Sequence, residues 1–222
     1  ESDLYAIDFS CYMANEAKVM KKIAEELDDK ENADLFGSWY EKIKDHINST
    51  LWCEEDGFYY DYDITNNCFH KVQSVSSFLP IFSGVCSAQQ REKLIDHLVN
   101  PDEFGTEFSI PTISKKDATF GSDLWRGPVW VNYNYMISEG LTSYGYTSLA
   151  EKIKDKTLRV INEWYNRAGT VYEFYDSENR IPPYCFNRKG KVYEPYDFRV
   201  KYQTIRDYGW SITLTFDMLN MR

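Results

Sequence analysis

Apolar residues recur at helical spacing along most of the chain. Residues 8–29 and 32–51 each carry an apolar stripe that repeats about every four residues, and the Asp28-Asp29 pair separates the two stripes. The pattern predicts two helices joined by a short polar turn. Further helices are predicted at residues 74–83, 87–99, 128–144, 146–166 and 206–221.

The turn residues define the ends of these elements. Pro128 is expected in the first turn of its helix, where a missing N–H is tolerated. Asp8 is expected to be the N-cap of the first helix. Residues 100–124 and 168–200 contain several prolines and glycines and are predicted to be irregular. Loops of that length in a compact domain usually have a function.

Residues 54–63 break the helical pattern, because aromatic side chains alternate with aspartates after Gly57. The alternation predicts a short β-hairpin arm. Tyr59, Asp61 and Asp63 are expected to lie on a solvated part of this arm rather than in a substrate site. The whole chain, residues 1–222, is therefore predicted to be a single, mainly α domain of paired helices, short turns and long aromatic loops.

Composition narrows the possible functions. A formal charge of −10 argues against nucleic acid and anionic membranes as partners, and no apolar run approaches the roughly 18 residues of a membrane span. The five scattered cysteines favour free thiols in a reducing, cytoplasmic compartment. The three histidines form no HxxH pair, so no metal site is expected. No Gly-rich phosphate loop is present, and no cofactor is expected. The aromatic content of 17% fits either a ring-lined pocket or a tyrosine-rich core.

Two segments concentrate the candidate chemistry. Residues 121–130 (Gly-Ser-Asp-Leu-Trp-Arg-Gly-Pro-Val-Trp) place two indoles and a guanidinium beside a Gly-Pro turn. Residues 170–176 (Thr-Val-Tyr-Glu-Phe-Tyr-Asp) place the carboxyl group of Glu173 among aromatic rings. Aromatic faces with a few fixed charges suit a sugar ring, and carboxyl groups perform the acid–base steps of glycoside hydrolysis.

The hexapeptide Trp-Arg-Gly-Pro-Val-Trp at residues 125–130 resembles the signature of glycoside hydrolase family 63. That family includes processing α-glucosidases and mannosylglycerate hydrolases and is related to the trehalases. Segments in the same order as in the family occur at residues 6–9, 109–114, 171–176 and 208–211, so the resemblance covers most of the chain. It implies an (α/α)6 barrel, in which six helical hairpins form a toroid, and inverting hydrolysis of an α-glucoside or α-mannoside.

The resemblance implies that Glu173 is the general base. Tyr172 and Tyr175 are expected to hold its carboxylate by hydrogen bonds, and Tyr172 also to contact substrate. The family's general acid is an Asp in a Gly-x-Asp-Asn-Ser-Pro type motif upstream of the segment matched by residues 6–9, and this sequence has no such motif. The acid is therefore expected in a part of the protein outside this chain, which would hold an incomplete toroid.

The remaining candidates would bind an oligosaccharide or glycoside substrate. At least one of Trp125 and Trp130 is expected to line the sugar site, the alternative being that both are core indoles. Arg126 could bond sugar hydroxyls or a substrate carboxylate, or form an ion pair with Asp123. Trp210 is a further candidate for the pocket.

Two other functions remain open: a non-catalytic carbohydrate-binding module, and a different α/α-toroid enzyme such as a lyase, epimerase or prenyl-type transferase. The missing acid motif predicts that the isolated chain is inactive. An incomplete toroid should also expose apolar helix faces, which predicts self-association.

Overall fold

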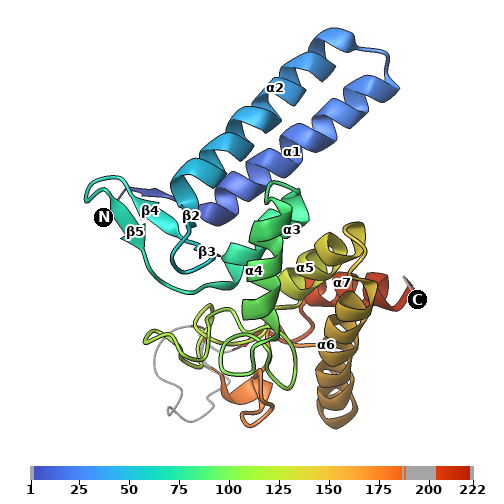
Figure 1. Ribbon diagram of the computed structural model, residues 1–222. Helices are drawn as coiled ribbons and strands as arrows, with labels where there is room; N and C mark the ends of the chain where they lie inside the picture. The colour runs from blue at the N-terminus through green and yellow to red at the C-terminus, as the bar shows by residue number, and fades with distance from the viewer. Residues whose placement is uncertain (1–2, 187, 189–203, 221–222) are drawn as a thin grey trace. The chain divides into compact units, whose positions relative to one another are not determined.

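The computed structural model describes residues 3–186, 188 and 204–220 of the chain (Figure 1). Contacts divide the chain into two compact units, residues 1–95 and 96–222. Most of the described residues are helical, as the hydrophobic pattern predicts. No described helix combines the length and the apolar character needed to cross a membrane.

The first unit begins with a helical hairpin made of α1 (Ile7–Glu26) and α2 (Lys30–His46), which pack side by side (Figure 1). Asp28 turns the chain with a φ of +56°. Asp29 then caps α2 by accepting a hydrogen bond from the backbone N–H of Asn32 at 3.1 Å. The predicted hairpin and its polar turn are therefore confirmed.

Two small antiparallel sheets follow the hairpin. A π-helical turn, η1 (Ile47–Leu51), leads into β2 (Trp52–Cys53), which pairs with β3 (Phe58–Tyr59). In the other sheet, β4 (Asp61–Asp63) lies between β1 (Leu4–Tyr5) and β5 (Cys68–His70). The unit continues through the 3-10 turn η2 (Val75–Phe78) into the short helix α3 (Leu79–Ser83).

The expectation of a solvated arm is wrong for its named residues. Tyr59 is fully buried, and its hydroxyl donates to Asn48 Oδ1 at 2.6 Å. Asp61 Oδ1 accepts a hydrogen bond from the N–H of Ile7 at 2.9 Å and so caps α1. Asp63 is also buried and accepts from the N–H of Asn66. These side chains therefore stabilise the first unit through hydrogen bonds, from β3 for Tyr59 and from β4 for Asp61 and Asp63.

The same contact corrects the role of Asp8. The N-cap of α1 is Ala6, whose side chain makes no capping hydrogen bond, and Asp8 lies within the first turn. The capping oxygen comes from β4 instead.

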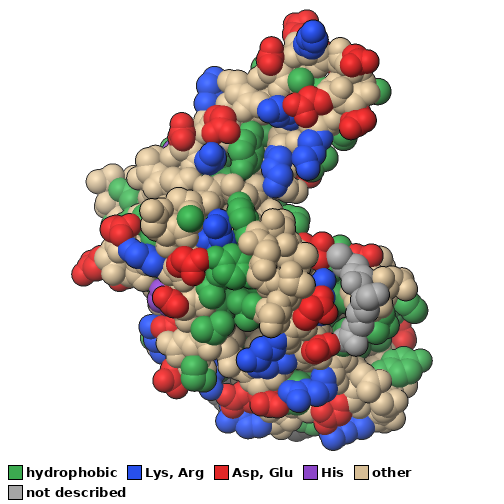
Figure 2. Space-filling model, turned by 45° about the vertical axis from the view of Figure 1, so that its right-hand side comes forward, with side chains coloured by type: hydrophobic (Ala, Val, Ile, Leu, Met, Phe, Trp, Pro, Cys, Tyr) green, Lys and Arg blue, Asp and Glu red, His purple; other side chains and the backbone are tan. Residues whose placement is uncertain are grey.

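The hairpin also exposes apolar side chains, with Phe9 72% and Leu27 73% exposed, and it carries interspersed acidic and basic side chains (Figure 2). The expected exposed apolar faces are present, and self-association remains a prediction.

The second unit is built on three helices, α5 (Val131–Ser143), α6 (Thr147–Ala168) and α7 (Gly209–Asn220). The helix α4 (Ala88–Val99) crosses the boundary between the units. Along α6 the predicted apolar face is confirmed, because Ile153, Val160 and Trp164 are buried. The hydrophobic cluster of this unit contains Phe108, Val131, Leu158, Val160, Ile161, Trp164, Tyr172, Tyr175 and Met218.

The start of α5 differs from the prediction. Trp130 is its N-cap, so Pro128 lies before the helix rather than in its first turn. The carbonyl of Pro128 accepts a hydrogen bond from the N–H of Thr112 at 3.2 Å, and this pairing holds the segment extended. Residues 100–124 are irregular, as predicted. Residues 169–186 contain one 3-10 turn, η3 (Pro183–Cys185), and residues 189–200 of that predicted loop lie outside the described residues.

All five cysteines are described and carry free thiols, with Cys68 exposed. Among the described residues, no group of three or more His, Cys, Asp or Glu side chains is arranged to hold a metal ion.

Candidate active site

Backbone hydrogen bonds bring the motif segments of the second unit together. Thr112 N–H donates to the carbonyl of Pro128, and Val129 exchanges two hydrogen bonds with Tyr175 at 2.7 and 3.0 Å. Glu173 N–H in turn donates to the carbonyl of Ile205 at 3.0 Å. Segments that lie up to about ninety residues apart therefore form one irregular antiparallel ladder. The ladder brings motifs that are distant in sequence into one place.

A tight turn holds the signature segment. Gly127 has a φ of +115°, and a Cβ atom at this position would lie 2.1 Å from the carbonyl oxygen of Gly121. Only glycine fits such a conformation and such an approach. The N–H of Gly127 donates to Thr112 Oγ1 at 2.9 Å, and the N–H of Gly121 donates to the carbonyl of Arg126 at 2.9 Å. The Gly-Pro step thus serves to place the two neighbouring indoles.

Those indoles stack face to face. The ring centroids of Trp125 and Trp130 are 3.5 Å apart at an interplanar angle of 16°, and Phe174 stacks on Trp130 at 5.2 Å. Trp130 is buried, and its Nε1 donates to the carbonyl of Leu124 at 2.8 Å. Trp125 is 39% exposed. One indole therefore supports the stack from the core, while the other presents a surface that a sugar ring could contact.

Glu173 directly precedes Phe174 in the chain and is buried, with 1% of its side chain exposed. Its Oε2 accepts a hydrogen bond from the N–H of Ile205 at 3.3 Å and lies 3.0 Å from Nε of Arg188 in an ion pair. Burial raises the pKa of Glu173, while the Ile205 N–H and the charge of Arg188 act in the opposite direction. The carboxyl group is therefore balanced between desolvation and two groups that favour its ionised form.

For Tyr175 the expectation that a flanking tyrosine holds this carboxylate is wrong. The hydroxyl of Tyr175 accepts a hydrogen bond from the backbone N–H of Tyr172 at 2.9 Å, and both rings belong to the hydrophobic cluster. The structure places Tyr172 in the core at 1% exposure. The contacts that hold the Glu173 carboxylate come from Ile205 and Arg188, which are distant in sequence.

Arg126 and Trp210, the two remaining candidate site residues, lie nearer the surface. Arg126 donates through Nε and Nη2 to Asp123 Oδ1, at 3.0 and 2.6 Å, so of the two alternatives for its guanidinium the structure shows the ion pair. Trp210 is the second residue of α7 and is 50% exposed.

The structure adds residues that the sequence did not single out. The pKa of Tyr208 is raised by burial and by the negative charge of Glu173, and its ring meets Trp130 edge to face at 6.4 Å. Ser211 donates from its hydroxyl to the carbonyl of Glu173 at 3.3 Å. Tyr208 and Ser211 both belong to the Tyr-Gly-Trp-Ser segment at residues 208–211, and the resemblance of this segment to the family could have singled them out. Arg188 and Ile205 follow no motif.

Comparison with known proteins identifies the family. The family model described as the mannosylglycerate hydrolase MGH1-like glycoside hydrolase domain matches residues 2–211. The chain belongs to this glycoside hydrolase family. The family resemblance predicted from the hexapeptide is thereby confirmed.

The relatives include two curated proteins described as mannosylglycerate hydrolases. The one from Rubrobacter radiotolerans is 28% identical over 66% of this chain, and the one from Thermus thermophilus is 31% identical over 57% of it. A crystal structure of a family 63 mannosylglycerate hydrolase from Thermus thermophilus, with glucose bound, matches 100% of this chain with a TM-score of 0.73 at 20% identity.

These matches confirm the mainly α fold class of the (α/α)6 glycosidases. The chain spans 33% and 29% of the lengths of the two curated relatives and 46% of the solved structure.

Proposed function

We propose that the protein hydrolyses an α-glycosidic bond, with Glu173 as the general base that deprotonates the attacking water. The observation that carries this proposal is the setting of the Glu173 carboxyl group, which is buried, paired with Arg188 and hydrogen-bonded by the N–H of Ile205. Tyr208, whose pKa is raised by the charge of Glu173, links this group to the stacked indoles through its edge-to-face contact with Trp130. A buried carboxyl group with a raised pKa suits a base that must accept a proton during the reaction. Arg188 and the Ile205 N–H keep it ionised beforehand.

We propose a glucoside or mannoside as substrate, since the relatives are described as mannosylglycerate hydrolases. The exposed ring of Trp125 offers an apolar face for the C–H face of a pyranose. Arg188 and Arg126 are two cationic side chains that already pair with carboxylates, and an acidic aglycone would compete with Glu173 or Asp123 for them.

Inversion needs a second carboxyl group about 6.5–9.5 Å from the base, so that a water molecule fits between them. We assign no residue of this chain to that general acid. The mechanism is therefore proposed for the full-length protein, in which Glu173 activates water on one face of the sugar while an acid protonates the leaving oxygen on the other.

The test compares the full-length protein with its Glu173→Gln variant on α-glucosides, α-mannosides, mannosylglycerate and trehalose, following the anomer of the product by NMR. Glu178→Gln is the matched control, because Glu178 lies in the same loop and pairs with Lys115 and Arg180. We expect an inverted product, a loss of about 100- to 10,000-fold in kcat for Glu173→Gln, and little change for Glu178→Gln.

Two results would contradict the proposal. Full activity in Glu173→Gln would exclude this residue as the base, and product of retained configuration would exclude the inverting mechanism. Sugar binding without turnover in the parent protein would instead support the carbohydrate-binding module.

A further inference from the structure

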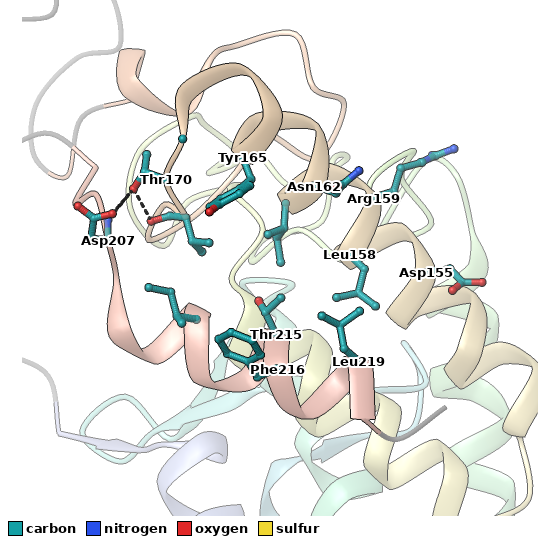
Figure 3. Close-up of a pocket in the computed structure, with 14 residues that line it drawn as sticks. Asp155, Leu158, Arg159, Asn162, Tyr165, Thr170, Asp207, Thr215, Phe216 and Leu219 are labelled. Atoms are coloured by element: carbon teal, nitrogen blue, oxygen red, sulfur yellow. Dashed lines mark hydrogen bonds between the residues drawn. The ribbon is translucent and has the colours of Figure 1, made fainter.

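The segment that presents Ile205 to Glu173 is held at its other end by two side chains. Thr170 Oγ1 donates to Asp207 Oδ1 at 2.7 Å, and the backbone N–H of Asp207 donates back to Thr170 Oγ1 at 2.9 Å (Figure 3). Thr170 is buried just after the C-terminal end of α6, and Asp207 lies just before α7. The pair lines one end of a groove of about 820 Å³ between these helices (Figure 3).

The backbone at Asp207 needs such support. Its φ is +51°, in the left-handed region that side chains with a Cβ atom seldom adopt. A conformation of this kind persists where surrounding contacts determine it. The two hydrogen bonds to Thr170 act on both the side chain and the N–H of Asp207, so they fix the residue from two directions.

From this pair the ladder runs directly to the candidate base. Tyr208 N–H donates to the carbonyl of Val171 at 3.2 Å, and Tyr172 pairs with Arg206. Ile205 then accepts from the N–H of Glu173 and donates to its carboxylate. The register of residues 204–208 against residues 170–173 therefore decides whether the Ile205 N–H reaches Glu173 Oε2.

We propose that Thr170 and Asp207 are positioning residues of the Glu173 site, which set this register and so aim the Ile205 N–H at the carboxylate. The inference rests on the proposed role of Glu173 as general base. Within the described part of the chain, the groups that face the carboxylate are the Ile205 N–H, the guanidinium of Arg188 and the phenol of Tyr208. The Thr170–Asp207 pair acts on the Ile205 N–H through the register of the ladder, which also holds Tyr208 through its N–H to Val171.

Breaking the Thr170–Asp207 pair should change the pKa of Glu173 in a definite direction. The Ile205 N–H lowers the pKa of Glu173 against the effect of burial. Loss of that hydrogen bond leaves the ionised form less stabilised, so the pKa of the base rises further. Because the base works only when ionised, the acid limb of the kcat/KM profile must move to higher pH.

The test uses Thr170→Val, which removes the hydroxyl at nearly constant shape, and Thr170→Ser, which keeps it. Thr157→Val is the matched control, since Thr157 is a buried threonine of the same unit that bonds to the carbonyl of Ile153 and to Asn134. In the full-length protein we expect Thr170→Val to lower kcat by roughly 10- to 100-fold and to move the acid limb upward. Thr170→Ser should retain the parent profile, and Thr157→Val should change stability alone.

An acid limb that stays in place in Thr170→Val, or that moves as far in Thr157→Val, overturns the inference. If Thr170→Val does not fold, Asp207→Ala gives the same measurement from the other side of the pair, with the same expected shift. Glu173→Gln separates the two proposals. Full activity there refutes the general base, whereas an inactive Glu173→Gln beside an unaltered Thr170→Val refutes only the positioning role.

Discussion

Glu173 and Ile205 are joined by two hydrogen bonds that run in opposite directions. The N–H of Glu173 donates to the carbonyl of Ile205 at 3.0 Å, and the N–H of Ile205 donates to Oε2 of Glu173 at 3.3 Å. The same neighbour thus fixes both the backbone and the carboxyl group of the candidate base. Its orientation is set by the main chain, which is stiffer than a contact between two long side chains.

Arg188 supplies the charge in this arrangement, and its removal should be visible in the pH dependence. Burial raises the pKa of Glu173 and Arg188 opposes that rise, so Arg188→Met should raise the pKa further. The acid limb of kcat/KM should therefore begin at higher pH in the variant. Arg180→Met is the control, because Arg180 is 71% exposed and pairs with Glu178. An acid limb that moves to lower pH in Arg188→Met would show that another group titrates.

Substitutions of the two stacked indoles should affect different properties, stability for Trp130 and substrate binding for Trp125. Trp130 is buried, so Trp130→Ala should cost about 3–5 kcal/mol in the free energy of unfolding. Trp125 is 39% exposed, so Trp125→Ala should cost clearly less and instead raise KM. Urea denaturation and steady-state kinetics measure the two effects. An unchanged KM in Trp125→Ala would remove this indole from the proposed sugar site.

The turn at Gly127 should not tolerate a Cβ atom. Gly127→Ala combines an unfavourable φ of +115° with a contact of 2.1 Å to the carbonyl of Gly121. Gly145 has a φ of +83° and no atom within 4 Å of its hypothetical Cβ, so Gly145→Ala measures backbone strain alone. We expect about 1–2 kcal/mol for Gly145→Ala and a larger loss, with loss of activity, for Gly127→Ala. Equal melting temperatures of the two variants would contradict the close approach.

The sequence predicted the elements whose causes are local. The hairpin of α1 and α2 follows from a regular apolar period and a polar turn, both of which are visible in a short window. The cap of α1 could not be predicted this way, because Asp61 reaches the N–H of Ile7 across 54 residues. The predicted place of Pro128 in the first turn of α5 is wrong for a related reason. The carbonyl of Pro128 accepts a hydrogen bond from the N–H of Thr112, a residue outside the local window, and the helix begins later.

The predictions for the candidate site divide in the same way, between residues that lie in a local motif and residues that reach the site from a distant segment. Glu173 and the two indoles could be predicted because each lies in a recognisable motif, and within the first motif the structure explains Gly127, where a Cβ atom would meet the carbonyl of Gly121. Tyr175 lies two residues from Glu173 in sequence, but its hydroxyl accepts from the N–H of Tyr172 and its ring packs in the hydrophobic cluster, so neighbours in sequence need not be neighbours in the site. Arg188 and Ile205 act through a guanidinium and a backbone N–H from a distant segment, and such contacts leave no pattern in the sequence.

The buried carboxylate of Glu103 makes the stability of the fold sensitive to pH. Glu103 is almost fully buried between His97, whose Nδ1 lies 2.5 Å from Oε2, and the ammonium of Lys116. Although burial raises the pKa of Glu103, the hydrogen bonds and charges of Lys116 and His97 outweigh that effect and lower it. A folded pKa below the unfolded value of about 4.3 means that this stabilisation is present above that pH and is lost as pH falls through the folded value.

Glu103→Gln should therefore destabilise the protein by about 2 kcal/mol near pH 7, with the difference shrinking below about pH 4 as the parent's own carboxylate becomes protonated. Denaturation by urea at a series of pH values measures this difference. Glu107→Gln is the control, because Glu107 and its partner Arg159 are 60% and 55% exposed and such surface pairs contribute little. A stability difference between parent and Glu103→Gln that is constant from neutral to acid pH would show that the ion pairs of Glu103 do not stabilise the fold.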